Sequence, residues 1–171
     1  MLPLAVQNKN ILRLAAAQAL AGANSVVFYA TGAIVGNAIA PSPSLATLPI
    51  TLFVLGMAAS ILLFGALARK RGRKDAFMAG TGAGVVTGLA AALAVVLGSF
   101  LLFCFAAMLG GAYAAVALSF RFAATDGVAP ERRARALSLV MGGGVAAGII
   151  GPMLVTGTMH LWPTHTFAFT F

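Results

Sequence analysis

The chain has 171 residues, of which 61% are hydrophobic and only 8% charged, and its mean hydropathy is +1.01. A soluble globular domain is roughly half apolar and about a quarter charged, so this composition excludes a soluble enzyme, a disordered protein and a disulfide-stapled secreted domain. Lys and Arg number 11 against 3 Asp and Glu, a formal net charge of +8. Because the charges lie in short clusters between apolar runs, they are typical of membrane-protein loops and not of a nucleic-acid-binding surface. We therefore expect an integral membrane protein whose partner is the lipid bilayer, with no nucleic acid.

Five apolar runs are each long enough for one helical crossing of a bilayer, which takes about 20 residues. They cover about residues 11–39, 46–68, 76–97, 100–120 and 136–160. The runs are too long for barrel strands and do not alternate apolar with polar residues, and a helix satisfies its own backbone hydrogen bonds in lipid. The predicted fold class is all-α: a polytopic transmembrane helical bundle of about five spans, in a single domain over residues 1–171. Residues 164–171 read like the first turns of a sixth span, so we expect the domain to be incomplete at its C-terminus.

Charged residues predict the orientation of the spans. Lys9 and Arg13 precede the first run, five basic residues lie between the second and third runs, and four lie between the fourth and fifth. The other connections, at 36–45 and 98–99, carry no charge. Since Lys and Arg concentrate in cytoplasmic loops, this alternation predicts a cytoplasmic N-terminus and an external residue 171. A cleaved signal peptide near the N-terminus is the alternative, which we disfavour because the first apolar run continues unbroken to Ile39.

Glycines recur at helical spacing within the runs. Rows of small residues occur at Gly80, Gly84 and Gly88, at Gly144 and Gly148, and at Gly32 and Gly36. Such rows let helix backbones approach closely in lipid, so they are predicted to mark helix–helix contacts. Contacts of this kind also permit helices to rock against one another, and neither role excludes the other.

The first run carries an unusual polar load. Its polar side chains are Gln18, Asn24, Ser25, Tyr29 and Thr31. Amides avoid lipid, so this helix is expected either to hydrogen-bond to neighbouring helices or to line a wet cavity. The fourth run offers Tyr113, a residue type that more often packs than binds a ligand.

The sequence lacks the patterns that catalysis requires. No run has an Asp, Glu, Lys or Arg near its middle, the two histidines are isolated, and the one cysteine, Cys104, lies inside an apolar run. No Ser/His/Asp set, phosphate-binding loop or cluster with metal-ligand spacing is present. We therefore predict no catalytic residues, no metal site and no cofactor, and we disfavour an enzyme.

The connection between the second and third runs resembles the signature loop of the major facilitator superfamily of transporters. That loop commonly reads Gly, three residues, Asp, a basic residue, any residue, Gly and two basic residues. The matching positions here are Gly65, Lys70, Gly72, Arg73 and Lys74. Arg69 stands where the family has the Asp, which helps to latch the two halves of the transporter on the cytoplasmic side. The resemblance implies a gating role for residues 65–74. The latch Asp itself is replaced by Arg69.

Two further segments resemble the same family. Residues 121–138 look like the loop between helices four and five of bacterial members. Gly148, Gly151 and Pro152 resemble the Gly-Pro element of helix five. The glycines that usually follow this element are absent, since Val155 and Thr156 stand there, and this departure weakens an assignment as an antiporter.

The resemblance covers essentially the whole chain but only the first five of the family's usual twelve helices. It implies an N-terminal fragment of a secondary transporter in a bacterial inner membrane, moving a small solute by alternating access. The partner would be a second helical bundle, either a missing C-terminal half or an oligomer partner. By analogy, spans one and four face the substrate path, with Gln18, Asn24, Tyr29 and Tyr113 as candidate lining residues. The alternative is a non-transporting helical membrane subunit or assembly protein.

Overall fold

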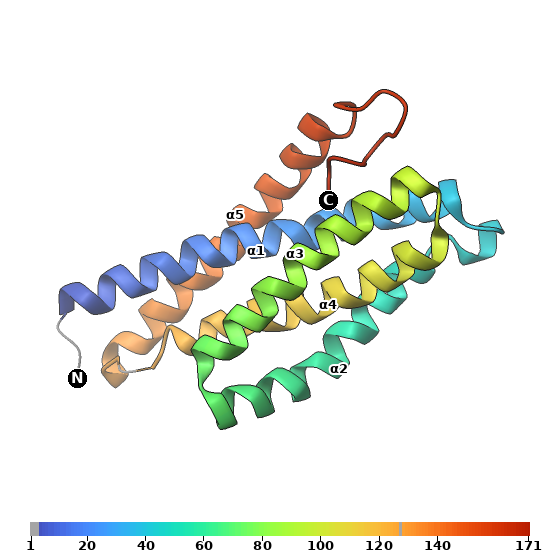
Figure 1. Cartoon of the computed structure of the whole chain (residues 1–171). Coiled ribbons are helices and arrows are strands. Elements are labelled where there is room, and N and C mark those ends of the chain that lie inside the picture. Colours follow the sequence, from blue (N-terminus) through green and yellow to red (C-terminus); the bar gives the residue numbers. More distant parts are fainter. Residues whose placement is uncertain (1–3, 127) are drawn as a thin grey trace.

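The computed structural model describes residues 4–126 and 128–171, with side chains described from residue 7 onward. Its helices are α1 (Leu4–Ile39), α2 (Leu48–Arg71), α3 (Arg73–Leu97), α4 (Phe100–Ala123) and α5 (Pro130–Thr158), with a short 3-10 turn, η1 (Pro43–Leu45) (Figure 1). All five α-helices are long and apolar enough to cross a membrane, and the described residues contain no strand. The all-α fold class is confirmed. Helices α1 and α5 begin earlier than the apolar runs, at Leu4 and Pro130, because their polar first turns continue the helix beyond the apolar part.

Two connections are tight, and each uses a glycine for a specific reason. Gly72 is the single residue between α2 and α3 and has φ +92°, a conformation that residues with a side chain rarely adopt. Gly98 ends α3 in the left-handed region, with φ +61°. The Ser99 hydroxyl then accepts a hydrogen bond from the Leu102 N–H at 3.4 Å, which caps the start of α4. These connections make α2, α3 and α4 an antiparallel series.

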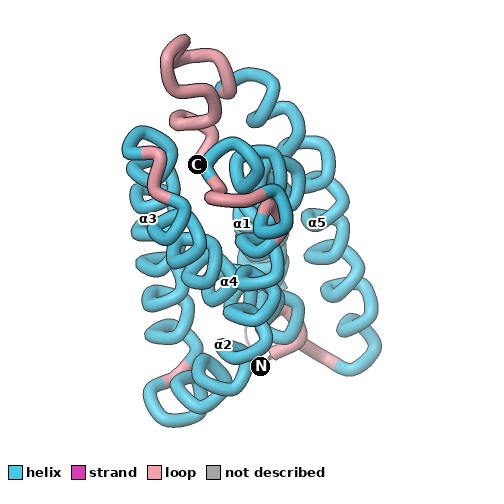
Figure 2. Tube along the Cα trace, turned by 90° about the vertical axis from the view of Figure 1, so that its right-hand side faces the viewer, coloured by secondary structure: helices cyan, strands magenta, loops and turns pink. Residues whose placement is uncertain are grey.

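Helix α4 is the most enclosed of the five helices. It packs against α2 and α3, and more lightly against α1, whereas α5 packs mainly along α1. In the view of Figure 2, α3 and α5 therefore lie on opposite sides of the central pair α1 and α4. The connections α2–α3 and α4–α5 lie with the start of α1 at one end of the bundle, and the connections α1–α2 and α3–α4 lie at the other end (Figure 1).

Glycines mark the closest helix approaches. Between α2 and α4, Gly56 faces the Met108 backbone and Gly111 faces the Phe53 carbonyl oxygen. Between α3 and α4, a Cβ at Gly80 would lie 2.6 Å from the Val116 side chain. These contacts lack room for a side chain. Of the row predicted in the third run, Gly80 and Gly84 face α4, whereas Gly88 faces the Phe171 carbonyl of the tail.

The predicted row in the fifth run was on the wrong face. Gly144 and Gly148 have open space around them. The residues of α5 that approach α1 are instead Gly143, which faces the Ala15 backbone, and Gly151, where a Cβ would lie 2.6 Å from Val26. Ala147 completes that second stripe, so both stripes repeat every four residues and the spacing alone could not distinguish them.

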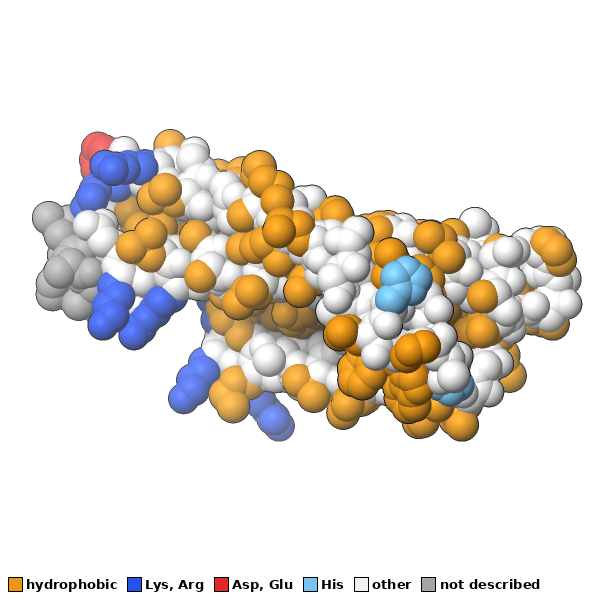
Figure 3. Space-filling view, turned by 90° about the horizontal axis from the view of Figure 1, so that it is seen from above, with side chains coloured by type: hydrophobic (Ala, Val, Ile, Leu, Met, Phe, Trp, Pro, Cys, Tyr) orange, Lys and Arg blue, Asp and Glu red, His pale blue; other side chains and the backbone are white. Residues whose placement is uncertain are grey.

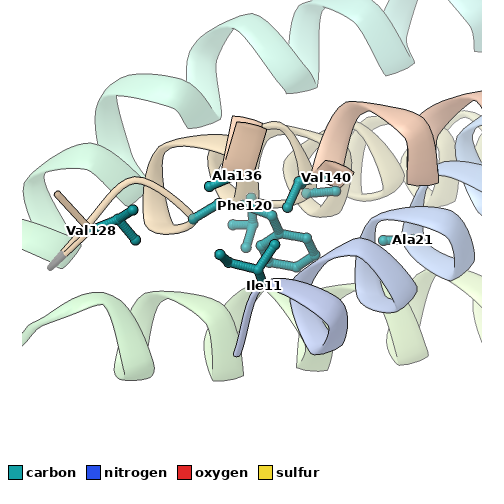
Figure 4. Close-up of a cluster of buried hydrophobic side chains, with 9 residues drawn as sticks. Ile11, Ala21, Phe120, Val128, Ala136 and Val140 are labelled. Atoms are coloured by element: carbon teal, nitrogen blue, oxygen red, sulfur yellow. The ribbon is translucent and has the colours of Figure 1, made fainter. Parts of the chain in front are cut away.

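Two buried apolar clusters hold the bundle together. One lies near the start of α1 and the α4–α5 connection, where Ile11, Phe120, Val128 and Val140 point toward one another (Figure 4). The other lies toward the opposite end, where Phe28 stacks on Phe53 at a ring distance of 5.4 Å.

The final residues fold back onto this second cluster. Residues 164–171 form turns and not the helical start of a sixth span that the sequence suggested. The Phe171 ring lies 5.0 Å from the Phe28 ring and 5.4 Å from the Phe103 ring. Aromatic packing against the bundle thus accounts for the folded-back course of the tail.

Candidate functional site

All of the charged side chains gather at one end of the bundle, which we call the basic end and define by residues 7–13, 69–75 and 121–135. In the space-filling view the Lys, Arg and acidic side chains lie at this end, and the rest of the visible face carries apolar side chains among uncharged atoms, with His at the opposite side (Figure 3). Arg73 Nε lies 2.8 Å from Asp126 Oδ2 and ties the α2–α3 connection to the α4–α5 connection. Arg132 donates a hydrogen bond to Asn8 Oδ1 at 3.4 Å, which ties α5 to α1. The three basic segments, far apart in sequence, therefore share one end.

Some of the signature-loop residues line a cavity at this end. It has a volume of about 580 Å³ and lies between α2, α3 and α4. Gly65, Arg69, Arg73 and Arg121 line it together with apolar and aromatic side chains, and no acidic residue does. Lys70 and Lys74 lie nearby as exposed side chains. The cavity is therefore cationic.

The ion pair between Arg73 and Asp126 contributes little stability. Its side chains are 41% and 56% exposed, so water screens the attraction. An exposed pair of this kind stabilises a protein by roughly 1 kcal/mol or less. Arg69, which stands in place of the family's Asp, forms no ion pair with the described residues.

The Gly-Pro element lies in the C-terminal half of α5. Gly151 contacts α1, whereas Gly148 and Pro152 are exposed. Proline has no backbone N–H, so the Gly148 carbonyl loses its usual helical donor. Thr156 donates its hydroxyl to the Pro152 carbonyl at 3.1 Å, one turn later.

The four predicted path residues do not converge on one place. Gln18 lines a small cavity of about 160 Å³ between α1, α4 and α5. Tyr29 is 48% exposed, and its ring lies edge-on at 5.3 Å from the Phe53 ring. Asn24 is half-buried, and its Oδ1 has no hydrogen-bond partner. Tyr113 lies against α3, where a Cβ at Gly84 would come within 3.0 Å of its ring, a place that favours packing.

Arg121 is not among the candidate site residues predicted from the sequence, where it counts as an orientation charge and as the first residue of the loop resemblance at residues 121–138. It lies on the last turn of α4, is half-buried, and lines both the 580 Å³ and the 160 Å³ cavities. Its Nε is buried without a hydrogen-bond partner. The sequence does indicate that Arg121 is partly enclosed. It stands between Phe120 and Phe122 at the end of the apolar run and not in the polar loop that follows. Within the part of the chain that the structure describes, no group of His, Cys, Asp or Glu side chains could hold a metal ion.

Comparison with known protein families identifies the group to which the fold belongs. The family model described as Major Facilitator Superfamily matches residues 14–171, and so includes all of α2 to α5 and most of α1. The chain belongs to the major facilitator superfamily. The resemblance seen in the signature loop is confirmed, and the chain is an integral membrane protein of a transporter family.

Relatives are similar to the chain over only part of their own length. A riboflavin transporter, RfnT, of Brucella anthropi is 40% identical over 163 residues, which cover 95% of this chain and 41% of the relative. An uncharacterized MFS-type transporter of Bacillus subtilis, YdeG, is 30% identical over 138 residues, which cover 81% of this chain and 32% of the relative. A second such transporter from that species, YddS, is 28% identical over 147 residues, or 86% of this chain and 34% of the relative. No solved structure matches the chain significantly.

Proposed function

We propose that this chain forms the N-terminal helical bundle of a secondary transporter, which moves a small solute across a bacterial inner membrane by alternating access. The family match over residues 14–171 is the observation that carries the proposal. In such transporters one bundle rocks against another around a site near the middle of the membrane. A chain that spans about two fifths of the length of the riboflavin transporter would supply one of those bundles.

The basic end is the cytoplasmic end in this proposal. Lys and Arg accumulate in cytoplasmic loops, and all three basic segments meet at one end of the bundle. The N-terminus would then be cytoplasmic and residue 171 external. The gating role of residues 65–74 follows from the same placement, because a single residue, Gly72, couples any tilt of α2 to α3.

Riboflavin is the first candidate solute. The support is the 40% identity with a riboflavin transporter over 95% of this chain. Riboflavin has a flat aromatic ring system with polar edges, and it needs both apolar surface and hydrogen-bonding groups. Helix α4 exposes Phe105 and Met108, and α1 offers the phenol of Tyr29 and the amides of Gln18 and Asn24.

Uptake of labelled riboflavin tests this proposal. The complete transporter would be expressed in bacteria that have no riboflavin importer of their own. We expect uptake that saturates with riboflavin concentration and is reduced by excess unlabelled riboflavin. A non-transporting membrane subunit would reach the membrane and give no uptake above that of cells carrying an empty vector.

A further inference from the structure

Arg121 differs from the other arginines of the α4–α5 region in having no protein acceptor for its buried nitrogen. Arg132 donates to Asn8, and Arg133 donates its Nε to the Val128 carbonyl. The Arg121 Nε is buried and has no hydrogen-bond partner. Its guanidinium carbon lies 5.0 Å from the centre of the Phe122 ring, so a ring covers one side of the charge without accepting a conventional hydrogen bond.

Neither cavity that Arg121 lines supplies a counter-charge. The smaller cavity, of about 160 Å³, is lined by Gln18, Leu118, Arg121, Val140, Met141 and Gly144. None of these residues is acidic, and none of the residues that line the 580 Å³ cavity is acidic either. A buried donor without an acceptor costs free energy, and an oxygen of a bound solute would satisfy it.

We propose that Arg121 and Gln18 together bind an acceptor oxygen of the transported solute, either a carbonyl or a carboxylate, at the cytoplasmic end of its path. The inference rests on the proposed transport function and names a part of its site. A guanidinium offers a planar fork of N–H donors that matches such oxygens, and the Gln18 amide adds a donor and an acceptor. Leu118, Val140 and Met141 would cover the apolar part of the solute beside that oxygen.

The geometry suits a subsite better than a complete binding site. About 160 Å³ admits one functional group or one edge of a ring, and the remainder of the solute would extend along the exposed face of α4. Riboflavin fits this class, because one edge of its ring system carries carbonyl oxygens. An arginine is the appropriate residue for this position, since it stays charged while half-buried and lysine's single ammonium group cannot form the same fork.

Riboflavin binding to the purified complete transporter tests the inference, with ligand fluorescence as the readout. For Arg121→Gln we expect Kd to rise roughly 10- to 100-fold, the effect of losing a hydrogen bond to a charged donor. Arg121→Lys should give a smaller increase, because it keeps the charge and loses the fork. Lys9→Gln is the matched control, since it removes one positive charge from an exposed position at the same end that lines neither cavity. Its Kd should equal that of the wild type.

Thermal stability distinguishes a solute-binding arginine from a structural one. The Tm of Arg121→Gln without riboflavin should stay level or rise, because the substitution removes a buried donor that has no partner. Gln18→Glu would place a carboxylate in the same cavity as Arg121. It should raise Tm and weaken riboflavin binding, because an internal carboxylate would occupy the guanidinium in place of the solute.

Three results would overturn the inference. An unchanged Kd in Arg121→Gln, with uptake intact, would remove Arg121 from the site and leave the proposed transport function standing. A Tm that falls in Arg121→Gln in step with affinity would show a structural role. Absence of riboflavin binding by the wild type would overturn the substrate proposal and this inference together.

Discussion

Gly72 is the residue on which the α2–α3 connection depends most directly. It is the single residue between the two helices, and its φ of +92° is a conformation that L side chains rarely adopt. Outside Gly72 and its two chain neighbours, no atom lies within 4 Å of the position that a Cβ would occupy, so the constraint is the backbone conformation and not a clash. A substitution here therefore tests the geometry of the connection without adding or removing charge.

We predict that Gly72→Val abolishes or strongly reduces transport without reducing the amount of protein in the membrane. At φ +92° and ψ +163°, Gly72 has a backbone conformation that is essentially restricted to glycine, and another residue held there costs roughly 1–3 kcal/mol. A β-branched side chain is especially unfavourable at positive φ. The strain would change the angle between α2 and α3, and this change would disturb the proposed gating by residues 65–74. Uptake of labelled riboflavin and quantification of protein in isolated membranes are the measurements.

Gly82→Val is the control for this prediction. Gly82 lies in helical backbone within α3 and has open space around it, so the same chemical change should leave uptake near the wild-type level. Normal uptake by Gly72→Val would refute the gating role of the loop. Equal losses in both variants would show that the effect does not come from the connection.

The elements pack through glycines, and the contact between α1 and α5 gives the clearest case. Gly143 faces the Ala15 backbone so closely that a Cβ would overlap the carbonyl oxygen, which is backbone and cannot rotate away. We predict that Gly143→Ala destabilises the bundle by about 1–3 kcal/mol, the usual cost of overpacking. The neighbouring Gly142→Ala meets open space and should be neutral or slightly stabilising.

Thermal unfolding of the two purified variants in the same detergent checks this prediction. The expected result is a lower Tm for Gly143→Ala and an unchanged or higher Tm for Gly142→Ala. Equal Tm values for the two variants would contradict the close approach of α5 to α1.

The sequence predicted the helices well because the information they require is local. The length of an apolar run and the positions of the flanking charges are sufficient to locate a membrane-spanning helix. The five spans, and the meeting of their charged ends at one side, could therefore be predicted from the sequence. Which face of a helix packs against the bundle depends on the neighbouring helices, and the sequence alone does not give it. The stripe that contains Gly144 and the stripe that contains Gly143 have the same spacing, and only the position of α1 selects the second.

The candidate site was predicted less well for the same reason. Gln18 was named from the sequence because an amide in an apolar run is conspicuous, and in the structure it lines a cavity. Tyr113 was a candidate by analogy with the family. In the structure its ring packs beside Gly84 of α3, whereas Gln18 lines a cavity with α4 and α5. Arg121 was read as a loop charge, and its lack of a partner becomes visible only when α5 closes the cavity on its other side.

At the scale of the whole molecule, the three basic segments at one end predict the topology. We expect Pro43→Cys to be labelled by a membrane-impermeant thiol reagent from outside intact cells, and Arg71→Cys to be labelled only after the membrane is permeabilised. Both positions are exposed, and the buried Cys104 would be replaced by Ala so that each variant carries one thiol. The reverse pattern would overturn the assignment of the basic end to the cytoplasm.

The central claim is that this chain acts as one of two bundles that move a solute by alternating access. Riboflavin counterflow tests it most directly: proteoliposomes are loaded with excess unlabelled riboflavin, and entry of labelled riboflavin is followed over time. For the complete transporter we predict transient accumulation of label above its equilibrium level, which requires a carrier that faces one side at a time. For the 171-residue chain alone we predict no such accumulation. Accumulation by the 171-residue chain alone, or simple equilibration without overshoot by the complete protein, would contradict the account.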